Sequence, residues 1–314
     1  MAGDIIAGVA GAGVFGGYHA RKYATLPGVR LGAVYDIDEE RAAKLAGQFG
    51  ATPYTDFTAF LKVVDAATIA SPASTHYELA RTALEAGRHV LIEKPIALRL
   101  DHADHIAKLA SEGGLAVQVG HQERFVFEGF GILSRSRAPK SVICRRRNPA
   151  TGRGEDVSVV FDLMIHDLDL VRRLGLGEAR SVAAMGDADN IEAEIEFTGG
   201  ASAIFEAGRG DERRDRRMTL VYEDGVIEID FLKRSISNST GAALSLSFED
   251  GAVHPAFADP LGHGVARFIE AVRGEAPPAI LAGEARDALE WALMIEGAAT
   301  PFAKLENTAM RARA

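Results

Sequence analysis

The sequence predicts an α/β fold in which a doubly wound parallel sheet is followed by an α+β domain. Up to about residue 120, short apolar runs alternate with longer amphipathic segments, as in repeated strand–helix units that build a parallel sheet. Beyond that point, residues 191–197 alternate apolar and acidic side chains, which is typical of an antiparallel strand with one solvated face. A length of 314 residues suits two domains, which we expect at 1–120 and 121–314.

The first domain is expected to contain strands that alternate with helices. The apolar runs predict strands at 5–9, 29–35, 63–69, 89–92 and 115–119. The amphipathic segments between them predict helices at 14–25, 38–49, 76–86 and 101–111. Gly87 and the pair Gly113-Gly114 follow the last two helices and are typical stop signals.

The second domain is expected to mix strands and helices. Its alternating segments predict strands at 191–197, 201–207, 218–222 and 226–231. Gly199-Gly200 and Asp224-Gly225 are typical hairpin turn signals between them. Helices are expected at 158–174, 265–272 and 284–311.

Composition excludes several classes of function. The chain has 35 Lys and Arg against 44 Asp and Glu, a net charge of −9, so its overall field does not favour nucleic acid or an anionic membrane. A single cysteine, Cys144, excludes an intrachain disulfide framework and a multi-cysteine metal site. The sequence contains no apolar run of the roughly 18 residues that a membrane-spanning helix needs. We therefore expect a cytoplasmic protein with no metal.

The first expected strand leads into a glycine-rich turn. Gly11-Ala12-Gly13-Val14-Phe15-Gly16 is a G-x-G-x-x-G motif that follows a strand and precedes a helix. In that position, bare glycines let the backbone approach a pyrophosphate at the helix N-terminus. Asp36 comes 20 residues after Gly16, at the end of the second strand. A carboxylate there binds the adenosine ribose 2′-hydroxyl and repels a 2′-phosphate, which favours NAD over NADP.

Other distinctive residues follow the later strands. Ser71-Pro72 comes after the third strand, Glu93-Lys94-Pro95 after the fourth, and His121-Gln122-Glu123-Arg124 after the fifth. Open α/β sheets bind ligands at these carboxyl ends, so one cleft can hold all three segments. Taken singly, each is also an ordinary loop sequence.

Lys94 is the strongest catalytic candidate in the first domain. An ammonium beside a bound nicotinamide can polarise a carbonyl or exchange protons with a hydroxyl. Pro95 holds Lys94 in an extended conformation, and the sequence leaves the bond between them open to either isomer.

The segment 158–174 carries the catalytic candidates of the second domain. Asp162, His166, Asp169 and Arg173 would occupy one stripe within roughly 60° of arc on an otherwise apolar helix. The stripe either faces a cleft or lies in solvent. In a cleft, a neutral His166 could accept a hydroxyl proton while Asp162 orients it.

Arginines are the candidates for phosphate recognition. Arg145-Arg146-Arg147 form a basic run whose alternate members either face solvent or reach a substrate phosphate. Arg124 and Arg153 are further candidates for binding the substrate.

Taken together, these motifs resemble the glucose-fructose oxidoreductase and inositol dehydrogenase family of two-domain NAD(P)-dependent sugar and cyclitol dehydrogenases. The resemblance covers most of the chain, and its most specific block is Glu93-Lys94-Pro95. The matching segments are residues 11–16 with His19, Asp36, 70–72 with His76, 86–95, 120–125 and 162–167.

The resemblance implies roles for individual residues. Lys94, Asp162 and His166 match the catalytic Lys, Asp and His of the family. The implied cofactor contacts are Gly11, Gly13, Val14, Phe15, Gly16, Asp36, Ser71, Pro72, His76 and Glu93. The substrate contacts would include Lys94, Arg124, Arg153 and His166. The family also implies an open antiparallel sheet in the second domain and a homodimer or homotetramer.

Segments 120–125 and 164–170 look most like family members that act on nucleotide sugars such as UDP-N-acetylglucosamine, oxidised at the 3-hydroxyl. We therefore expect an NAD-dependent dehydrogenase that oxidises a secondary hydroxyl of a sugar, cyclitol or nucleotide sugar to a ketone. The alternatives are an NAD-dependent hydrolase or epimerase without net redox, and a regulatory protein that senses NAD. Whether Lys94 or His166 is the base stays open.

Overall fold

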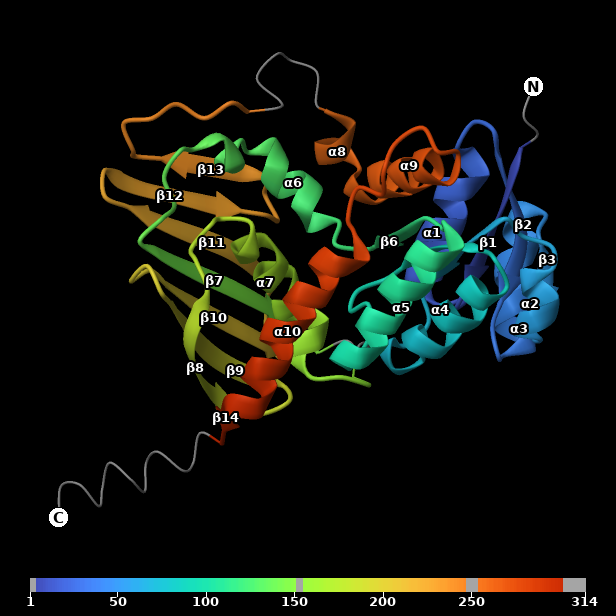
Figure 1. The fold of residues 1–314 in the computed structure, drawn as a ribbon, viewed down its shortest axis with the longest axis horizontal. Helices are drawn as coiled ribbons and strands as arrows, with labels where there is room; N and C mark the ends of the chain where they lie inside the picture. Colours follow the sequence, from blue (N-terminus) through green and yellow to red (C-terminus); the bar gives the residue numbers. More distant parts are fainter. Residues whose placement is uncertain (1–3, 151–154, 247–253, 302–314) are drawn as a thin grey trace. The chain divides into compact units, whose positions relative to one another are not determined.

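The computed structural model describes residues 4–150, 155–246 and 254–301 (Figure 1). Its contacts divide the chain into two compact units. Unit 1 comprises Met1–Gln122 and Pro255–Arg286, and unit 2 comprises Glu123–His254 and Asp287–Ala314. Residues 255–286, which the sequence places in the second domain, therefore belong to unit 1 by their contacts. The predicted domain boundary near residue 120 stays a prediction.

Unit 1 is built on a six-stranded parallel sheet with the order β3-β2-β1-β4-β5-β6. The strands are β1 (Ile5–Ala10), β2 (Val29–Tyr35), β3 (Thr52–Tyr54), β4 (Ala66–Ile69), β5 (His89–Ile92) and β6 (Val117–Val119). This strand order is that of the Rossmann fold, so the predicted doubly wound sheet is confirmed. Only β3 was not expected, because three residues that include Pro53 carry no strand signal.

Four helices of unit 1 begin and end close to where the sequence predicts, and the short helix α3 (Phe57–Leu61) was not expected. The expected helices are α1 (Val14–Thr25), α2 (Glu39–Phe49), α4 (His76–Glu85) and α5 (Leu100–Gly113), with a 3₁₀ turn η1 (Ala73–Thr75) before α4. Asp38 caps α2 by accepting a hydrogen bond from the backbone N–H of Arg41. Gly87 and Gly114 adopt the left-handed conformation after α4 and α5, as the stop signals predict.

Two helices from later in the chain complete unit 1: α8 (Pro255–Ala258) and α9 (Pro260–Val272). Val265, Phe268 and Ile269 of α9 are buried in the same apolar cluster as Tyr23 and Leu31. Their spacing puts them on one face of the helix, which is typical of a helix that packs against a core. This pattern predicts the helix, but it does not predict which part of the protein the helix packs against.

Unit 2 is built on an eight-stranded sheet with the order β13-β12-β11-β7-β10-β9-β8-β14. The strands are β7 (Ser141–Asn148), β8 (Ala179–Gly186), β9 (Asn190–Phe197), β10 (Ser202–Arg209), β11 (Asp215–Tyr222), β12 (Gly225–Asp230), β13 (Ser235–Asn238) and β14 (Ala299–Thr300). Only the β7–β10 and β8–β14 pairs are parallel, so the predicted open, mainly antiparallel sheet is confirmed.

One face of this sheet is buried beneath helices. In β9, Ile191, Ala193, Ile195 and Phe197 are buried while the intervening glutamates are exposed, which is the predicted alternation. The helical elements of unit 2 include α6 (Glu123–Gly129), the 3₁₀ turn η2 (Ile132–Ser134), η3 (Val160–Met164) and α7 (Ile165–Arg172). The long helix α10 (Ala282–Ala298) also contributes, because Trp291 lies against Phe197 with a ring separation of 5.4 Å.

Two predicted helices differ from the structure. The segment expected as one helix over 158–174 divides into the π-helix η3 and the α-helix α7. The helix expected over 284–311 ends at Ala298, because residues 299–300 leave it to pair with β8. Residues 302–311 lie outside the described residues.

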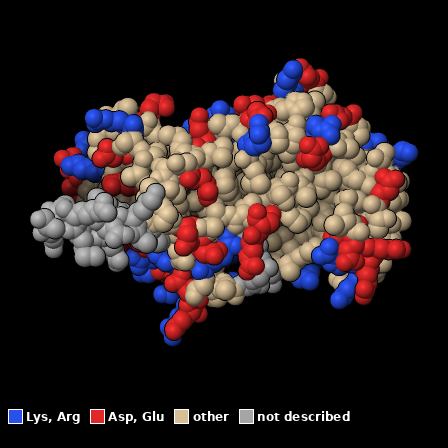
Figure 2. Space-filling model, turned by 90° about the horizontal axis from the view of Figure 1, so that it is seen from below, with Lys and Arg blue, Asp and Glu red and all other residues tan. Residues whose placement is uncertain are grey.

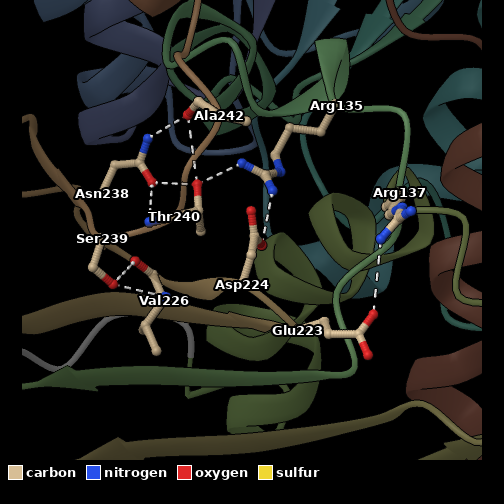
Figure 3. A network of polar contacts seen from close by, with 9 residues as sticks. All are labelled: Arg135, Arg137, Glu223, Asp224, Val226, Asn238, Ser239, Thr240 and Ala242. Atoms are coloured by element: carbon tan, nitrogen blue, oxygen red, sulfur yellow. Dashed lines mark hydrogen bonds and ion pairs between the residues drawn. The ribbon is translucent and has the colours of Figure 1, made fainter.

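A polar network fixes the loop after β13 (Figure 3). Arg135 Nη1 donates to Thr240 Oγ1 at 2.7 Å, and the Arg135 guanidinium also lies 4.1 Å from the centre of the Tyr222 ring. Asn238 accepts a hydrogen bond from the hydroxyl of Thr240 at 2.6 Å. The loop is therefore tied to the β11–β12 hairpin, whose turn residue Asp224 pairs with Arg135.

Acidic and basic side chains are interspersed over the face of the molecule in Figure 2. A mixed surface of this kind creates no large field of one sign. Among the residues that the structure describes, no helix is both long and apolar enough to cross a bilayer.

Candidate active site

The turn between β1 and α1 uses each glycine of its motif differently. Gly11 has φ +102°, and a Cβ there would lie 2.6 Å from the backbone nitrogen of Ser71. A Cβ on Gly16 would lie 1.8 Å from the carbonyl oxygen of Gly11. A Cβ on Gly13, in contrast, would meet nothing within 4 Å. Gly11 and Gly16 are thus required by the fold, whereas Gly13 leaves open space at the N-terminus of α1.

This arrangement fits the pyrophosphate of a dinucleotide. Gly13 is the N-cap of α1, so no side chain covers the N-terminal N–H groups from that position, and no acidic residue lies in the first turn. The N-terminal N–H groups and the helix dipole favour an anion at that position. Val14 and Phe15 follow directly, with 41% and 45% of their surfaces exposed.

Asp36 lies beside the same turn. Its Oδ2 accepts a hydrogen bond from the N–H of Ala12 at 2.7 Å, and its Oδ1 accepts from the N–H of Asp38 at 2.9 Å. Arg41 donates to Oδ1 at 3.1 Å. A carboxylate offers about four acceptor sites, so these three bonds leave room for a ribose hydroxyl. Asp36 therefore keeps acceptor capacity beside the glycine turn.

The loops after β4 and β5 are held together by His76. In this buried ring, Nδ1 lies 2.7 Å from the carbonyl oxygen of Pro95 and Nε2 lies 3.0 Å from that of Ser71. Burial lowers the pKa of His76, and a neutral imidazole has one N–H, so it donates to one of these two oxygens. The ring lies between the two main-chain segments, so Ser71 and Pro72 lie near Lys94-Pro95. The Lys94-Pro95 bond is cis.

Glu93 has a buried carboxylate at the end of β5. Its Oε1 lies 2.6 Å from Nε2 of His19 and accepts a hydrogen bond from Gln122 at 2.8 Å. Burial opposes ionisation, but the bond to His19 and the charges of His19, Lys94 and His76 outweigh it, so the pKa of Glu93 is lowered. A Cβ on Gly120 would lie 2.8 Å from this carboxylate, so a bare residue is needed there.

Lys94 is half-buried and lies between Glu93 and the cis proline, where the sequence predicts it. Within unit 1 the structure therefore brings together the glycine turn, Asp36, Ser71, His76, Glu93 and Lys94 through neighbouring strands.

Unit 2 carries Asp162 and His166. Asp162 lies in the π-helix η3, and His166 is the second residue of α7; both are half-buried. Single π turns within α-helices occur frequently at functional sites. The predicted polar stripe is only partly present, because Asp169 is buried and Arg173 pairs with Glu128 at 3.1 Å.

A buried ionic network lies next to these residues. Arg146 donates to Asp167 through Nε at 2.9 Å and Nη2 at 2.7 Å, and to Glu123 through Nη1 at 2.7 Å. Arg216, its cross-strand neighbour, donates to the same oxygen of Glu123 at 2.9 Å. Glu123 therefore bridges two arginines that would otherwise repel each other.

Burial acts to raise the pKa of both Glu123 and Asp167, but the neighbouring arginines oppose it, and the net shift differs between the two groups. For Glu123, the charges and hydrogen bonds of Arg146 and Arg216 prevail and lower the pKa to about 2. For Asp167, burial prevails over Arg146 and the pKa is raised. Ionised Glu123 thus stabilises the folded chain above its unfolded pKa, and this contribution is lost as the pH falls towards 2.

The predicted phosphate-binding arginines have diverse locations. Arg124 forms a buried ion pair with Asp169, each side chain being 2% exposed. Arg145 and Arg147 lie on the outer face of the sheet and pair with Glu206. Arg153 lies outside the described residues.

Comparisons with known proteins agree with this geometry. The chain is 33% identical over 282 residues to UDP-N-acetylglucosamine 3-dehydrogenase of Acidithiobacillus ferrooxidans, covering 86% of this chain and 89% of that protein. A solved structure of that enzyme aligns with a TM-score of 0.83 at 31% identity, covering 94% and 98% of the two chains. Inositol 2-dehydrogenase of Rubrobacter xylanophilus is 31% identical over 307 residues, which cover 88% and 86%.

A sequence model of the oxidoreductase family with an NAD-binding Rossmann fold matches residues 5–121. The chain belongs to this family. Membership confirms the predicted resemblance to the glucose-fructose oxidoreductase and inositol dehydrogenase group and makes the protein an oxidoreductase. The family binds NAD, in agreement with the fit of the β1–α1 turn to a dinucleotide.

Sequence reasoning missed Arg41 and Arg216, and it considered Arg146 only as a candidate phosphate ligand. Arg41 pairs with Asp36, and Arg146 and Arg216 bind Glu123. A signal for Arg146 was available, because alternation in β7 puts it on the same face as the buried Val142 and Cys144. The other two depend on contacts between separate elements.

We expect Gly13→Ala to affect NAD binding and Gly11→Ala to affect the stability of the fold. Gly13→Ala should leave the melting temperature without NAD nearly unchanged but weaken NAD binding by about tenfold or more, because its Cβ meets no protein atom within 4 Å and would enter the space proposed for the pyrophosphate. Gly11→Ala should destabilise the fold itself, because it clashes with backbone at a positive φ. Thermal melts with and without NAD check both expectations. Equal loss of stability in the two variants without NAD would contradict the assignment.

Proposed function

We propose that this oxidoreductase uses NAD to oxidise a secondary hydroxyl of a nucleotide sugar to a ketone. The observation that carries the proposal is the likeness to UDP-N-acetylglucosamine 3-dehydrogenase, which extends over 86% of the chain and therefore includes both units. The glycine turn, Asp36 and Lys94 of unit 1 supply chemistry that suits this reaction, as do Asp162 and His166 of unit 2.

Bound NAD supplies the acceptor for the hydride that leaves the carbinol carbon. The N-terminus of α1 would hold the pyrophosphate, and Asp36 would accept a hydrogen bond from the adenosine ribose. Ser71, Pro72, His76 and Glu93 shape the adjoining loops. Of these, His76 would act through the two main-chain segments that it contacts, and Glu93 through its Oε1, which contacts His19 and Gln122.

Proton transfer is assigned to Lys94, Asp162 and His166. Lys94 would bind the reacting oxygen and share the proton, His166 would accept the hydroxyl proton at a ring nitrogen, and Asp162 would orient the acceptor. His76 and Glu93 would fix the backbone on either side of Lys94. On this proposal, Lys94 is positioned by its buried neighbours.

We expect UDP-N-acetylglucosamine to be the preferred substrate among simple candidates. With NAD present, it should give NADH with a kcat/KM about tenfold or more above that for free N-acetylglucosamine or myo-inositol, because the nucleotide adds binding energy. Absorbance of NADH and thermal shifts on the same ligands provide the measurement. Faster turnover of inositol would contradict the substrate class. Product without NADH would instead indicate transient oxidation, and stabilisation without turnover would indicate a regulator.

We expect Lys94→Ala and His166→Ala each to lower kcat by about 100-fold or more, the range for a positioned acid–base group. Folding and the Kd for NAD should be preserved. Lys108→Ala is the matched control, since this exposed lysine makes only a surface contact with Glu112 at 3.7 Å. Near-normal kcat in either catalytic variant would remove that residue from the mechanism.

We expect NAD to bind about tenfold or more tightly than NADP, because Asp36 repels a 2′-phosphate. Asp36→Ser should reduce or reverse this preference, since it removes the repelling carboxylate and one of the two carboxylates, Asp36 and Asp38, that pair with the 55% exposed Arg41 side chain. Adding Arg41→Ala to that variant should abolish the gain in NADP binding. Titration of both cofactors against the wild type, the single variant and the double variant checks the prediction. Equal affinities in the wild type would refute it.

A further inference from the structure

Two acidic residues flank His166 on α7, and both are almost fully buried. The side chains of Asp167 and Asp169 are 3% and 2% exposed. Each is bound by one arginine that comes from a different element of unit 2. We call these two contacts the arginine forks.

The first fork joins α6 to α7. Arg124 donates to Oδ2 of Asp169 through Nε at 3.1 Å, and its Nη2 donates to Oδ1. The second fork joins β7 to α7, where Arg146 donates to both oxygens of Asp167 at 2.9 and 2.7 Å. Two parallel bonds define both the direction and the distance of a carboxylate, whereas one bond defines much less.

Glu123 connects the forks. It precedes Arg124 in α6 and accepts hydrogen bonds from Arg146 at 2.7 and 2.5 Å. With Arg216, the assembly contains three guanidinium groups and three carboxylates. These charges can balance without any change of protonation, which allows the assembly to be buried.

Helix geometry gives the forks a specific effect on His166. At about 100° per residue, Asp167 lies about 100° to one side of His166 on the helix surface and Asp169 about 60° to the other. Rotation of α7 about its axis would pull both carboxylates off their arginines. The π-helix that precedes α7 interrupts the regular ladder just before His166, so upstream helix cannot by itself set this rotation.

We propose that Arg124 and Arg146 are positioning residues that set the orientation of the His166 ring by fixing the rotation of α7. The inference rests on the catalytic role proposed for His166. It also gives Arg124 a function that differs from the phosphate contact expected from sequence. Lysine cannot replace either arginine, since one ammonium cannot form a fork.

The test uses Arg124→Lys and Arg146→Lys in the full-length chain with NAD bound. Arg217→Lys is the matched control, because Arg217 also forms a fork, to Asp215, but its side chain is 56% exposed. Two quantities are measured: the NMR signals of the His166 ring in histidine-labelled protein, assigned with His166→Gln, and the kinetic constants for UDP-N-acetylglucosamine and NAD.

Both fork variants should move the His166 ring signals and lower kcat by about 10- to 100-fold, as expected for a misplaced catalytic group, with KM for NAD preserved. The control should change neither quantity. Folded fork variants with wild-type ring signals, or with moved signals but wild-type kcat, would overturn the proposal, as would an equal effect of the control.

Asp169→Asn provides a second route if a lysine variant fails to fold. The amide keeps the shape of the carboxylate and one acceptor oxygen but loses the charge and the second acceptor. The same signals and constants decide the outcome. If no sugar is turned over by the wild type, the proposed function fails, while the ring signals still test whether the forks orient His166.

Discussion

The close approach of bare main chain at Gly11 and Gly16 is the constraint on which the cofactor turn depends. The loop after β4 passes so near Gly11 that a Cβ would lie 2.6 Å from the Ser71 nitrogen, and α1 begins so tightly that one on Gly16 would meet the Gly11 carbonyl. These contacts bring the ends of β1 and β4 together with the N-terminus of α1. The only glycine of the three that faces open space is Gly13, the one where a ligand can approach.

Around this turn, polar side chains occupy positions that apolar residues would fill in an ordinary core. His76 binds two carbonyl oxygens, and Glu93 binds His19 and Gln122. Each buried polar atom that is left unpaired costs free energy, so such networks specify one arrangement of the loops. These contacts also fix the main chain at Lys94, because Glu93 precedes it and Pro95 follows it.

In unit 2, buried ion pairs specify the arrangement of the neighbouring elements. A buried ion pair adds little stability relative to an apolar replacement, but removal of one partner costs about 3–5 kcal/mol. The forks to Asp167 and Asp169 therefore serve the geometry of α7 more than its stability. Their carboxylates also supply counter-charges for the arginines in the interior of unit 2.

The sequence by itself determined the parallel sheet, the glycine turn and the family. These features depend on local periodicity and on short motifs, such as residues 11–16 and Glu93-Lys94-Pro95, that are legible within one strand–helix unit. The structure locates Lys94, Asp162 and His166 on the predicted segments, and their catalytic roles stay predictions.

Only the tertiary structure decided which elements these residues contact. The apolar stripe of α9 is evident in the sequence, yet its packing against Tyr23 is not, because an apolar stripe is complementary to many surfaces. The end of the last helix at Ala298 depends on the pairing of residues 299–300 with β8, and no signal in the sequence predicts the π-helix at Asp162. Arg124 and Arg146 could be read as phosphate ligands until their carboxylate partners, 45 and 21 residues away, were known. The sequence shows that an arginine can bind a carboxylate or a phosphate. Which of these it binds depends on the groups that the fold brings next to it, and those groups can be distant in the sequence.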